Sequence, residues 1–539
     1  MSHHRSLRDF CSILCIAAFL QIVTAYPAAA NPIQFQTIAV TGQSTAEGDD
    51  EFAWFGSHSI NNAGQVAFVA ETRNPVGREQ SNIYLDDGYD LRRVVASYDA
   101  TPEGDGYFAS IDDAGLNLSD AGHVLFHSLL GNTSRGAAND RGAYLYEGST
   151  VSKIMREGDI PPDGNGVFTE AALVYFDQWL LNASGQVALR AEMGSTAAGT
   201  KDDTGLYFFD RSSLSTVARE GGPSPGGHYL FSSVGYYHQF ALNATGQLAF
   251  ALHRTDPDGT DRGQGLYLYQ QSTTTTVFEK GDVIVDPYWR PFAGCGDPTL
   301  DDHGQLAFEV GYGSGFMYNS GLFLHTSSSL TRIVETNEPA LDGNGKITSI
   351  NSTPLLLAGS GRVVFSVELT VQLDRAYRHD GAIYLYDNSS ITTILREGDL
   401  TPDGRYRFED VPQLIAANSA GQLLLFAENL ADVLTGESAC DALFLLGIHG
   451  SLVRIVGNGD VIDVDPSDAE DLRTVCEVFC EGPGNDDGKT RCLSDSGTVV
   501  FDLYFTDGSS GIFTATIIPE PASLALLTFA VLVMLRRRG

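Results

Sequence analysis

Short apolar runs, each preceded by the same kind of polar turn, recur along the chain. One copy begins Asn61-Asn62-Ala63-Gly64-Gln65 and continues into the apolar residues 66–69. Asn three residues before Gly predicts a tight turn, because the Asn side chain caps the turn and Gly accepts a positive φ. The run after the turn does not alternate with polar residues, so we expect a strand covered on both faces. Eight copies occur at intervals of about 60 residues, and their central glycines are Gly64, Gly122, Gly185, Gly246, Gly304, Gly361, Gly421 and Gly497.

Three further phrases predict the other strands of each repeat. Residues 142–146 and 205–209 are rich in Tyr and Phe, which is typical of strands. A third phrase, as at residues 154–159 and 394–399, is an apolar run that ends in a Gly turn. A short fourth strand through Phe168 leads to the next polar turn. Four short strands per repeat, without an amphipathic helix, predict the blade of a β-propeller.

Incomplete repeats at the two ends of the body predict that it closes into a ring. Residues 37–42 look like a third phrase with no first or second phrase before them. Residues 499–501 and 511–513 look like a first and second phrase with no third after them. A ring closed by strands from both ends has this offset, whereas an open solenoid needs capping repeats. We therefore expect an all-β fold in which residues 31–518 form one eight-bladed β-propeller, and two smaller propellers or sandwiches are the alternative.

The first 30 residues predict a cleavable signal peptide. Arg5 and Arg8 precede a short apolar run, and small residues that include Ala28 and Ala30 follow it as a cleavage site. Residues 23–25 offer an alternative cleavage site. A retained anchor is less favoured, because a membrane-spanning helix needs about 20 apolar residues.

The last 21 residues combine three features in order. These are Pro519, Glu520, Pro521 and Ser523, then a short apolar stretch over residues 524–535, then Arg536, Arg537 and Arg538. This tail resembles the PEP-CTERM sorting signal of exopolysaccharide-producing Gram-negative bacteria. The resemblance implies export to the cell envelope, outer surface or matrix, processing by an exosortase-like enzyme, and transient membrane association through a short hydrophobic helix. A plain C-terminal anchor is the alternative.

The repeated turn carries a second resemblance. Residues 61–68 and 243–250 are similar to the tandem repeats named for the pattern Asn-x-x-Gly-x-x-Ala-Phe, found in exported proteins with varied C-terminal anchors, the choice-of-anchor repeat family. This resemblance covers nearly all of residues 31–518 and implies no settled activity. Copies that start at Ser119, Ala358 and Ser494 lack the leading Asn, so strict capping by Asn is not required throughout.

The net charge of the chain argues against nucleic acid and anionic lipid as binding partners. The chain carries a formal charge of −35, with +1 on residues 1–30 and +2 on residues 519–539, so the body carries −38. Because the acidic residues are dispersed, we expect a soluble acidic surface that repels nucleic acid and anionic lipid. With 43% hydrophobic residues, the body can also build a large core.

Candidate chemistry is sparse in this sequence. Glu157, Glu220 and Glu397 recur in equivalent phrases, which favours a structural role over catalysis, so we expect no catalytic residue. Asp-rich turns at residues 256–261 and 485–488 favour calcium only weakly, because they lack a bidentate Glu at the required distance. We therefore expect no metal site and no cofactor, with calcium as the alternative.

Residues 457–491 are the most individual part of the body, because they lengthen the last repeat. Cys476, Cys480 and Cys492 cluster in or beside this insertion, and in an oxidising compartment we expect one disulfide among them. An insertion on one face of a propeller is a natural place for function, and a disulfide-pinned loop is the simpler alternative.

These observations favour an exported, non-catalytic repeat protein that binds extracellular polysaccharide or other surface components. Two alternatives remain open at this point. One is an extracellular polysaccharide hydrolase or lyase on a propeller scaffold, and the other is a calcium-stabilised surface scaffold.

Overall fold

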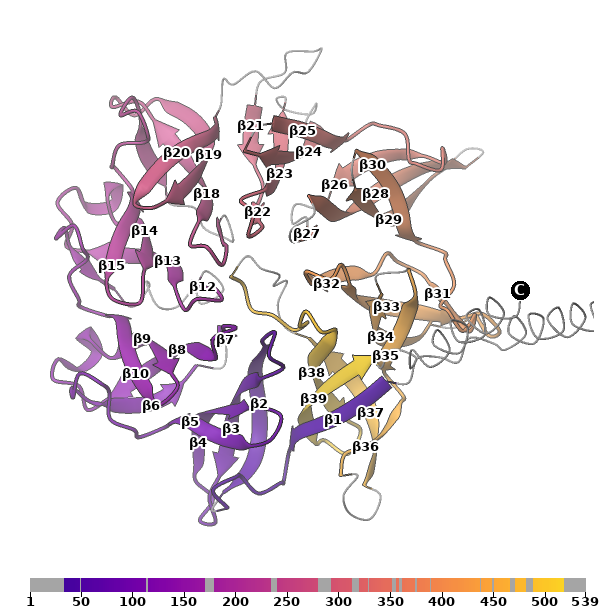
Figure 1. Ribbon diagram of the computed structural model, residues 1–539, viewed down its shortest axis with the longest axis horizontal. Helices are drawn as coiled ribbons and strands as arrows, with labels where there is room; N and C mark the ends of the chain where they lie inside the picture. Colours follow the sequence, from indigo (N-terminus) through magenta and orange to yellow (C-terminus); the bar gives the residue numbers. More distant parts are fainter. Residues whose placement is uncertain are drawn as a thin grey trace, which may run out of the picture. The chain divides into compact units, whose positions relative to one another are not determined.

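Eight β-sheets surround a common centre (Figure 1). This computed structural model describes residues 33–48, 50–112, 115–169, 179–233, 240–279, 292–312, 319–327, 329–350, 355–357, 361–373, 376–387, 389–436, 438–447, 450–465, 471–480 and 488–517. Residues 35–515 form one compact unit, and the propeller described below is that unit. Apart from two 3-10 turns, η1 (Gly136–Ala138) and η4 (Gly199–Lys201), the regular elements in these ranges are strands.

The first four blades follow one another along the chain. Blade 1 contains β2 (Glu51–Ile60), β3 (Val66–Arg73), β4 (Glu79–Asp86) and β5 (Leu91–Ala96). Blade 2 contains β6 (Tyr107–Ile111), β7 (Asn117–Leu118), β8 (His123–Gly131), β9 (Arg141–Glu147) and β10 (Thr150–Arg156). Blade 3 contains β11 (Val167–Phe168), β12 (Trp179–Leu181), β13 (Val187–Gly194), β14 (Thr204–Phe209) and β15 (Leu214–Arg219). Blade 4 contains β16 (Leu230–Ser233), β17 (Phe240–Leu242), β18 (Leu248–Thr255), β19 (Asp261–Gln270) and β20 (Thr273–Glu279).

The next three blades repeat this order. Blade 5 contains β21 (Phe292–Cys295), β22 (Thr299–Leu300), β23 (Leu306–Tyr312), β24 (Asn319–Thr326) and β25 (Ser329–Glu335). Blade 6 contains β26 (Lys346–Ile350), β27 (Leu355–Leu357), β28 (Arg362–Leu373), β29 (Ala376–Asp387) and β30 (Ser390–Arg396). Blade 7 contains β31 (Tyr406–Phe408), β32 (Gln413–Ala417), β33 (Leu423–Asp432), β34 (Ser438–Leu446) and β35 (Leu452–Gly457).

Blade 8 joins the two ends of the described chain. Its strand order is β1 (Ile33–Val40), β39 (Ser510–Ile517), β38 (Thr498–Phe505), β37 (Leu472–Phe479) and β36 (Val461–Asp463). Directly after β1, the Thr41 N–H donates to the Ser510 carbonyl at 2.9 Å. The predicted eight-bladed propeller, closed by strands from both ends, is therefore confirmed.

The first strand of blades 2–7 is interrupted, which the sequence did not predict. In blade 3, β11 and β12 both pair with β13, with Phe168 opposite Met193 and Leu181 opposite Val187. The phrase through Phe168 is thus the outer half of a broken strand, and the polar turn follows its second half. All the polar turns consequently lie at equivalent ends of the blades.

The hydrophobic core lies between neighbouring sheets. One cluster joins Leu125 and Leu145 of blade 2 to Leu189 of blade 3, and all three side chains are fully buried. Burial on both faces explains why the strands carry continuous apolar runs. The Gly-x-Tyr phrase has a packing reason, because a Cβ at Gly142 would lie 2.7 Å from the ring of Tyr144.

Several predictions concern segments outside the described residues. The signal peptide with Ala28 and Ala30, and the tail from Pro519 to Arg538, both lie outside them. Within the described ranges, we find no helix with the length and hydrophobicity that a membrane crossing requires.

Candidate functional site

The polar turns at the centre of the ring are joined by their Asn side chains. Asn182 Oδ1 accepts the N–H groups of Ser184 (3.1 Å) and Gln186 (2.9 Å), which caps its own turn. Its Nδ2 donates to Gln186 Oε1 (2.8 Å) and to the Asn243 carbonyl of the next blade (2.9 Å). Asn61, Asn243 and Asn418 also donate to their own Gln and to the next blade. One buried side chain therefore forms the turn and joins it to its neighbour.

Carboxylates at the second position of the turns strengthen the same contacts. The backbone N–H of Asn62 donates to Asp120 (2.9 Å), that of Ala244 to Asp302 (2.7 Å) and that of Ser419 to Asp495 (2.9 Å). At the ring closure the roles are reversed, because the Asp495 N–H donates to Asn62 Oδ1 at 2.8 Å. These carboxylates face the centre and bind neighbouring blades.

The central glycines lie against a Gln of the preceding blade. All eight predicted turn glycines have a positive φ, between 63° and 85°. At five of them, an added Cβ would lie 2.6–3.1 Å from that Gln Oε1: Gly122, Gly246, Gly304, Gly361 and Gly497. Glycine thus serves both the turn and the close approach of two blades.

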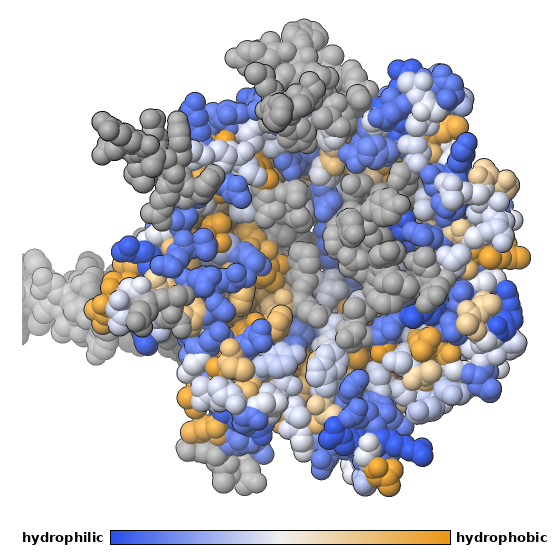
Figure 2. Space-filling view, turned by 180° about the vertical axis from the view of Figure 1, so that it is seen from behind, coloured by the Kyte–Doolittle hydropathy of each residue, from blue (hydrophilic) through white to orange (hydrophobic). Residues whose placement is uncertain are grey.

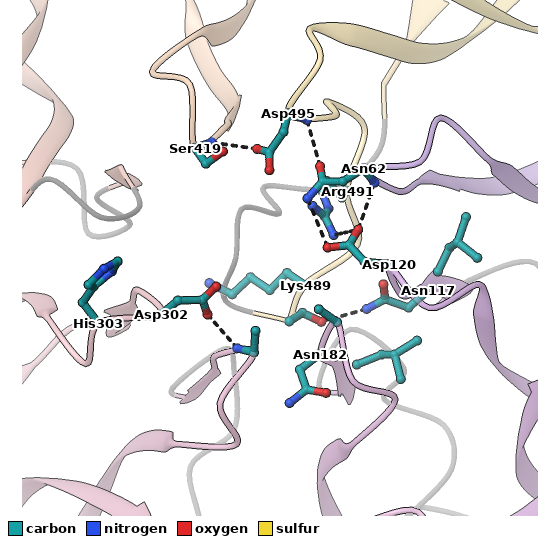
Figure 3. Close-up of a pocket in the computed structure, with 15 residues that line it drawn as sticks. Asn62, Asn117, Asp120, Asn182, Asp302, His303, Ser419, Lys489, Arg491 and Asp495 are labelled. Atoms are coloured by element: carbon teal, nitrogen blue, oxygen red, sulfur yellow. Dashed lines mark hydrogen bonds and ion pairs between the residues drawn. The ribbon is translucent and has the colours of Figure 1, made fainter.

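The end of the blade 8 insertion crosses the centre of the ring (Figures 1 and 3). We call residues 488–491 the plug. The Gly488 carbonyl accepts hydrogen bonds from the Leu181 N–H (2.8 Å) and from Asn117 Nδ2 (2.8 Å). The Arg491 carbonyl accepts one from the Ile60 N–H (2.8 Å). The plug therefore joins blade 8 to blades 1, 2 and 3.

A polar cavity of about 260 Å³ lies beside the plug. Arg491 is 8% exposed, and its Nη2 lies 2.9 Å from Asp120 Oδ1. Lys489 is equally buried and extends toward Asp302 (Figure 3). Burial raises the pKa of Asp302, and nearby Asp301 raises it further, while His303 and Arg491 oppose this. Carboxylates and cations therefore line the cavity together, and such a lining suits a small polar group.

The turns predicted from the sequence supply much of the cavity lining, including Asp120, Asn182 and Asp302. Lys489, Arg491 and Asn117 belong to no repeated phrase, and only the long last repeat pointed to the plug. The repeated Glu residues do not line the cavity. At the Asp-rich turn of residues 256–261, Asp256 makes an ion pair with Arg262. Residues 485–487 of the other Asp-rich turn lie outside the described residues. In the described ranges, no group of three or more His, Cys, Asp or Glu side chains is arranged to hold a metal.

The cysteine cluster lies beside β38. Within the described residues, Cys476, Cys480 and Cys492 form no disulfide with one another, and the bridge expected among them in an oxidising compartment stays a prediction. Cys480 Sγ donates to the Val500 carbonyl at 3.4 Å, and the Val500 N–H donates to the Cys492 carbonyl at 2.9 Å. Backbone and thiol hydrogen bonds to β38 hold the two sides of the insertion here.

Several solved structures are similar to this chain over most of its length, at low sequence identity. The Dos1 propeller is 9% identical, with a TM-score of 0.39, over 89% of this chain and 95% of that one. An oligogalacturonate lyase in complex with manganese is 12% identical, with a TM-score of 0.35, over 86% and 98%. An ulvan lyase of polysaccharide lyase family PL25 is 10% identical, with a TM-score of 0.30, over 76% and 96%. Identities this low bear on the fold alone.

Comparison of the sequence with protein families identifies one match. Among curated proteins, no match is found. A family described as "Family of unknown function (DUF7453)" matches over residues 28–213, 174–290 and 214–525, which together span most of the chain. Because this match covers more than half of the chain, the chain belongs to the DUF7453 family.

Proposed function

We propose that this protein is an exported, non-catalytic binding protein that holds extracellular polysaccharide on a rigid propeller. One observation carries the proposal. The carboxylates and amides at the centre of the ring, such as Asp120, Asn182 and Asp302, bind neighbouring blades or the plug. A catalytic acid or base must exchange protons with a substrate, whereas these groups stabilise the scaffold.

The location and the ligand class rest on the sequence. The tail that ends in Arg536, Arg537 and Arg538 supports sorting to the envelope or matrix by an exosortase-like enzyme. A chain of net charge −35 is suited to hydrated surroundings and poorly suited to binding nucleic acid. Extracellular polysaccharide is the abundant polymer of such surroundings, and it offers hydroxyl groups to the acidic surface.

A paired assay tests this function. The purified protein is applied to a glycan array, and each glycan that binds is then incubated with the protein and analysed for reducing ends and unsaturated products. We expect binding without turnover. Release of product from any glycan would contradict the non-catalytic function and favour a hydrolase or lyase.

Sorting is tested separately from binding. Mass spectrometry of the mature C-terminus, with and without Pro519, Glu520 and Pro521, measures whether the tail is processed. We expect processing only when the three residues are present. An identical C-terminus in both proteins would contradict sorting by this motif and leave the binding function unaffected.

A further inference from the structure

One position on the second strand of each blade normally faces the first strand of the next blade. In blade 2 this position is His127, whose ring lies 4.4 Å from that of Trp179 in blade 3. In blade 8 it is Asp502, which lies 2.6 Å from His58 Nδ1 in blade 1. His127 and Asp502 are both buried. In blade 7 the same position is Phe426, which is half-buried, as are Glu309 in blade 5 and Ser366 in blade 6.

Phe426 lines a cavity at the junction of blades 7 and 8. This cavity has a volume of about 390 Å³ and lies between β32, β33 and β37. Strand β37 ends at Phe479, opposite Asp502, at one side of the cavity. Its volume is within the range of about 300–1,000 Å³ that is usual for small-ligand sites. We call it the blade 7–8 groove.

Aromatic and aliphatic side chains form one part of the lining. Phe479 is 49% exposed, although its ring is supported edge-on by Tyr504 at a centroid distance of 5.9 Å. Ile415 and Phe426 are half-buried beside it. Figure 2 shows hydrophobic side chains gathered over blades 7 and 8 on the face turned away in Figure 1. The electron-rich face of a supported aromatic ring attracts the C–H face of a sugar ring.

Hydrogen-bonding groups form the other part of the lining. Glu428 and Glu477 are exposed carboxylates, and Gln413 Nε2 donates to Glu428 Oε1 at 3.1 Å. Asp441 Oδ1 accepts the Asn429 N–H at 3.0 Å. The described residues that line the groove include these three carboxylates and neither Lys nor Arg. Such a lining accepts hydrogen bonds from hydroxyl groups and repels anionic chains.

We propose that the blade 7–8 groove binds a neutral polysaccharide, with sugar rings stacked on Phe426 and Phe479 and hydroxyl groups donating to Glu428 and Glu477. This inference rests on the proposed function and gives it a place and a ligand class. The groove lining is distinct from the turn residues, such as Asn182 and Asn243, whose contacts join neighbouring blades.

Titration calorimetry of the full chain tests the site with three probes: a neutral β-glucan oligosaccharide, a polygalacturonate oligosaccharide and a glucosamine oligosaccharide. We expect the neutral probe to bind most tightly. Phe479→Ala removes the exposed ring and should weaken that binding about tenfold. Phe479→Tyr keeps the ring and should bind like the unchanged protein. Tyr89→Ala removes an exposed aromatic ring far along the chain and should have no effect.

The possible results distinguish a failure of the groove proposal from a failure of the proposed function. Neutral glycan binding that Phe479→Ala leaves unchanged would overturn the groove and leave the proposed function standing. Tightest binding of either charged probe would overturn the ligand class, since charge and not stacking would then dominate. Failure of all glycans, here and on the array, would overturn both proposals. Thermal unfolding of each variant shows whether a lost affinity reflects the site or a loss of folding.

Discussion

At the scale of single residues, a carboxylic acid next to another one holds its proton more tightly. Glu220 lies in the turn after β15, and its pKa is raised to about 7. Burial is the largest cause, and a hydrogen bond and repulsion from Asp203 act in the same direction, whereas Thr204 Oγ1, which donates to Glu220 Oε2 at 3.0 Å, lowers the pKa.

Glu220→Gln should stabilise the protein at high pH and not at low pH. The pKa of Glu220 rises from 4.5 to about 7 on folding. Between these values the unfolded chain releases the proton first, so the stability from the protonated group is complete below the lower value and lost as pH rises through the upper one. Gln cannot ionise. The variant should therefore melt above the unchanged protein at about pH 8 and alongside it at about pH 4. A difference that does not change with pH would contradict this assignment.

At the scale of elements, five of the eight polar turns pack on the Gln that follows the previous turn. Gly246 lies against Gln186, the same Gln whose Oε1 accepts the Asn182 side chain. Blade 1 lacks this contact, because Thr498 occupies the Gln position in blade 8 and no atom approaches a Cβ at Gly64 within 4 Å. The two turns are otherwise alike, with a φ of +81° at both glycines.

This difference gives a matched pair of variants. Gly64→Ala should cost about 1 kcal/mol of unfolding free energy, because a side chain is strained at positive φ. Gly246→Ala carries the same strain, and its Cβ would lie 2.6 Å from Gln186 Oε1. Displacing that amide should add about 1 kcal/mol. Urea unfolding measures both, and equal midpoints for the two variants would show that the Gln–Gly contact between blades contributes nothing.

The sequence was sufficient to predict the blades, because the signals for them are local. Turn glycines such as Gly246 predict a tight turn, and apolar runs such as residues 66–69 predict a buried strand, from the neighbouring residues alone. The two incomplete end repeats were sufficient to predict closure. The plug and the blade 7–8 groove were not predictable, because Lys489 and Phe426 acquire their roles only from strands distant in sequence. Clustering along the chain does not fix the distance between thiols, so the disulfide among Cys476, Cys480 and Cys492 stays a prediction.

At the scale of the whole molecule, the plug acts on several blades at once. Arg491 contacts Asp120 of blade 2 through its side chain and Ile60 of blade 1 through its carbonyl. Asp120 in turn accepts two hydrogen bonds from Asn62. A change at this point therefore reaches blades 1, 2 and 8 together.

Arg491→Ala should destabilise the whole ring and not one blade. The side chain is 10% exposed and its partner Asp120 is 29% exposed, so loss of the ion pair should cost about 3 kcal/mol. The control is Arg73→Ala, because Arg73 and Glu79 form a pair at 2.6 Å with side chains 57% and 50% exposed. An exposed pair of this kind contributes little to stability, because water screens the two charges. Thermal unfolding should distinguish them, and equal shifts would contradict a central role for the plug.

The contact between Thr41 and Ser510 has a kinetic consequence. These residues are 469 positions apart in the chain, yet they are direct partners in one sheet. Blade 8 cannot form until nearly the whole body has been synthesised, and contacts of such long range make folding slow. Until then, the strand before Thr41 has an unpaired edge. This edge can pair with an unpaired strand of another chain. The time spent in that open state sets how much a chaperone would improve the yield of folded protein.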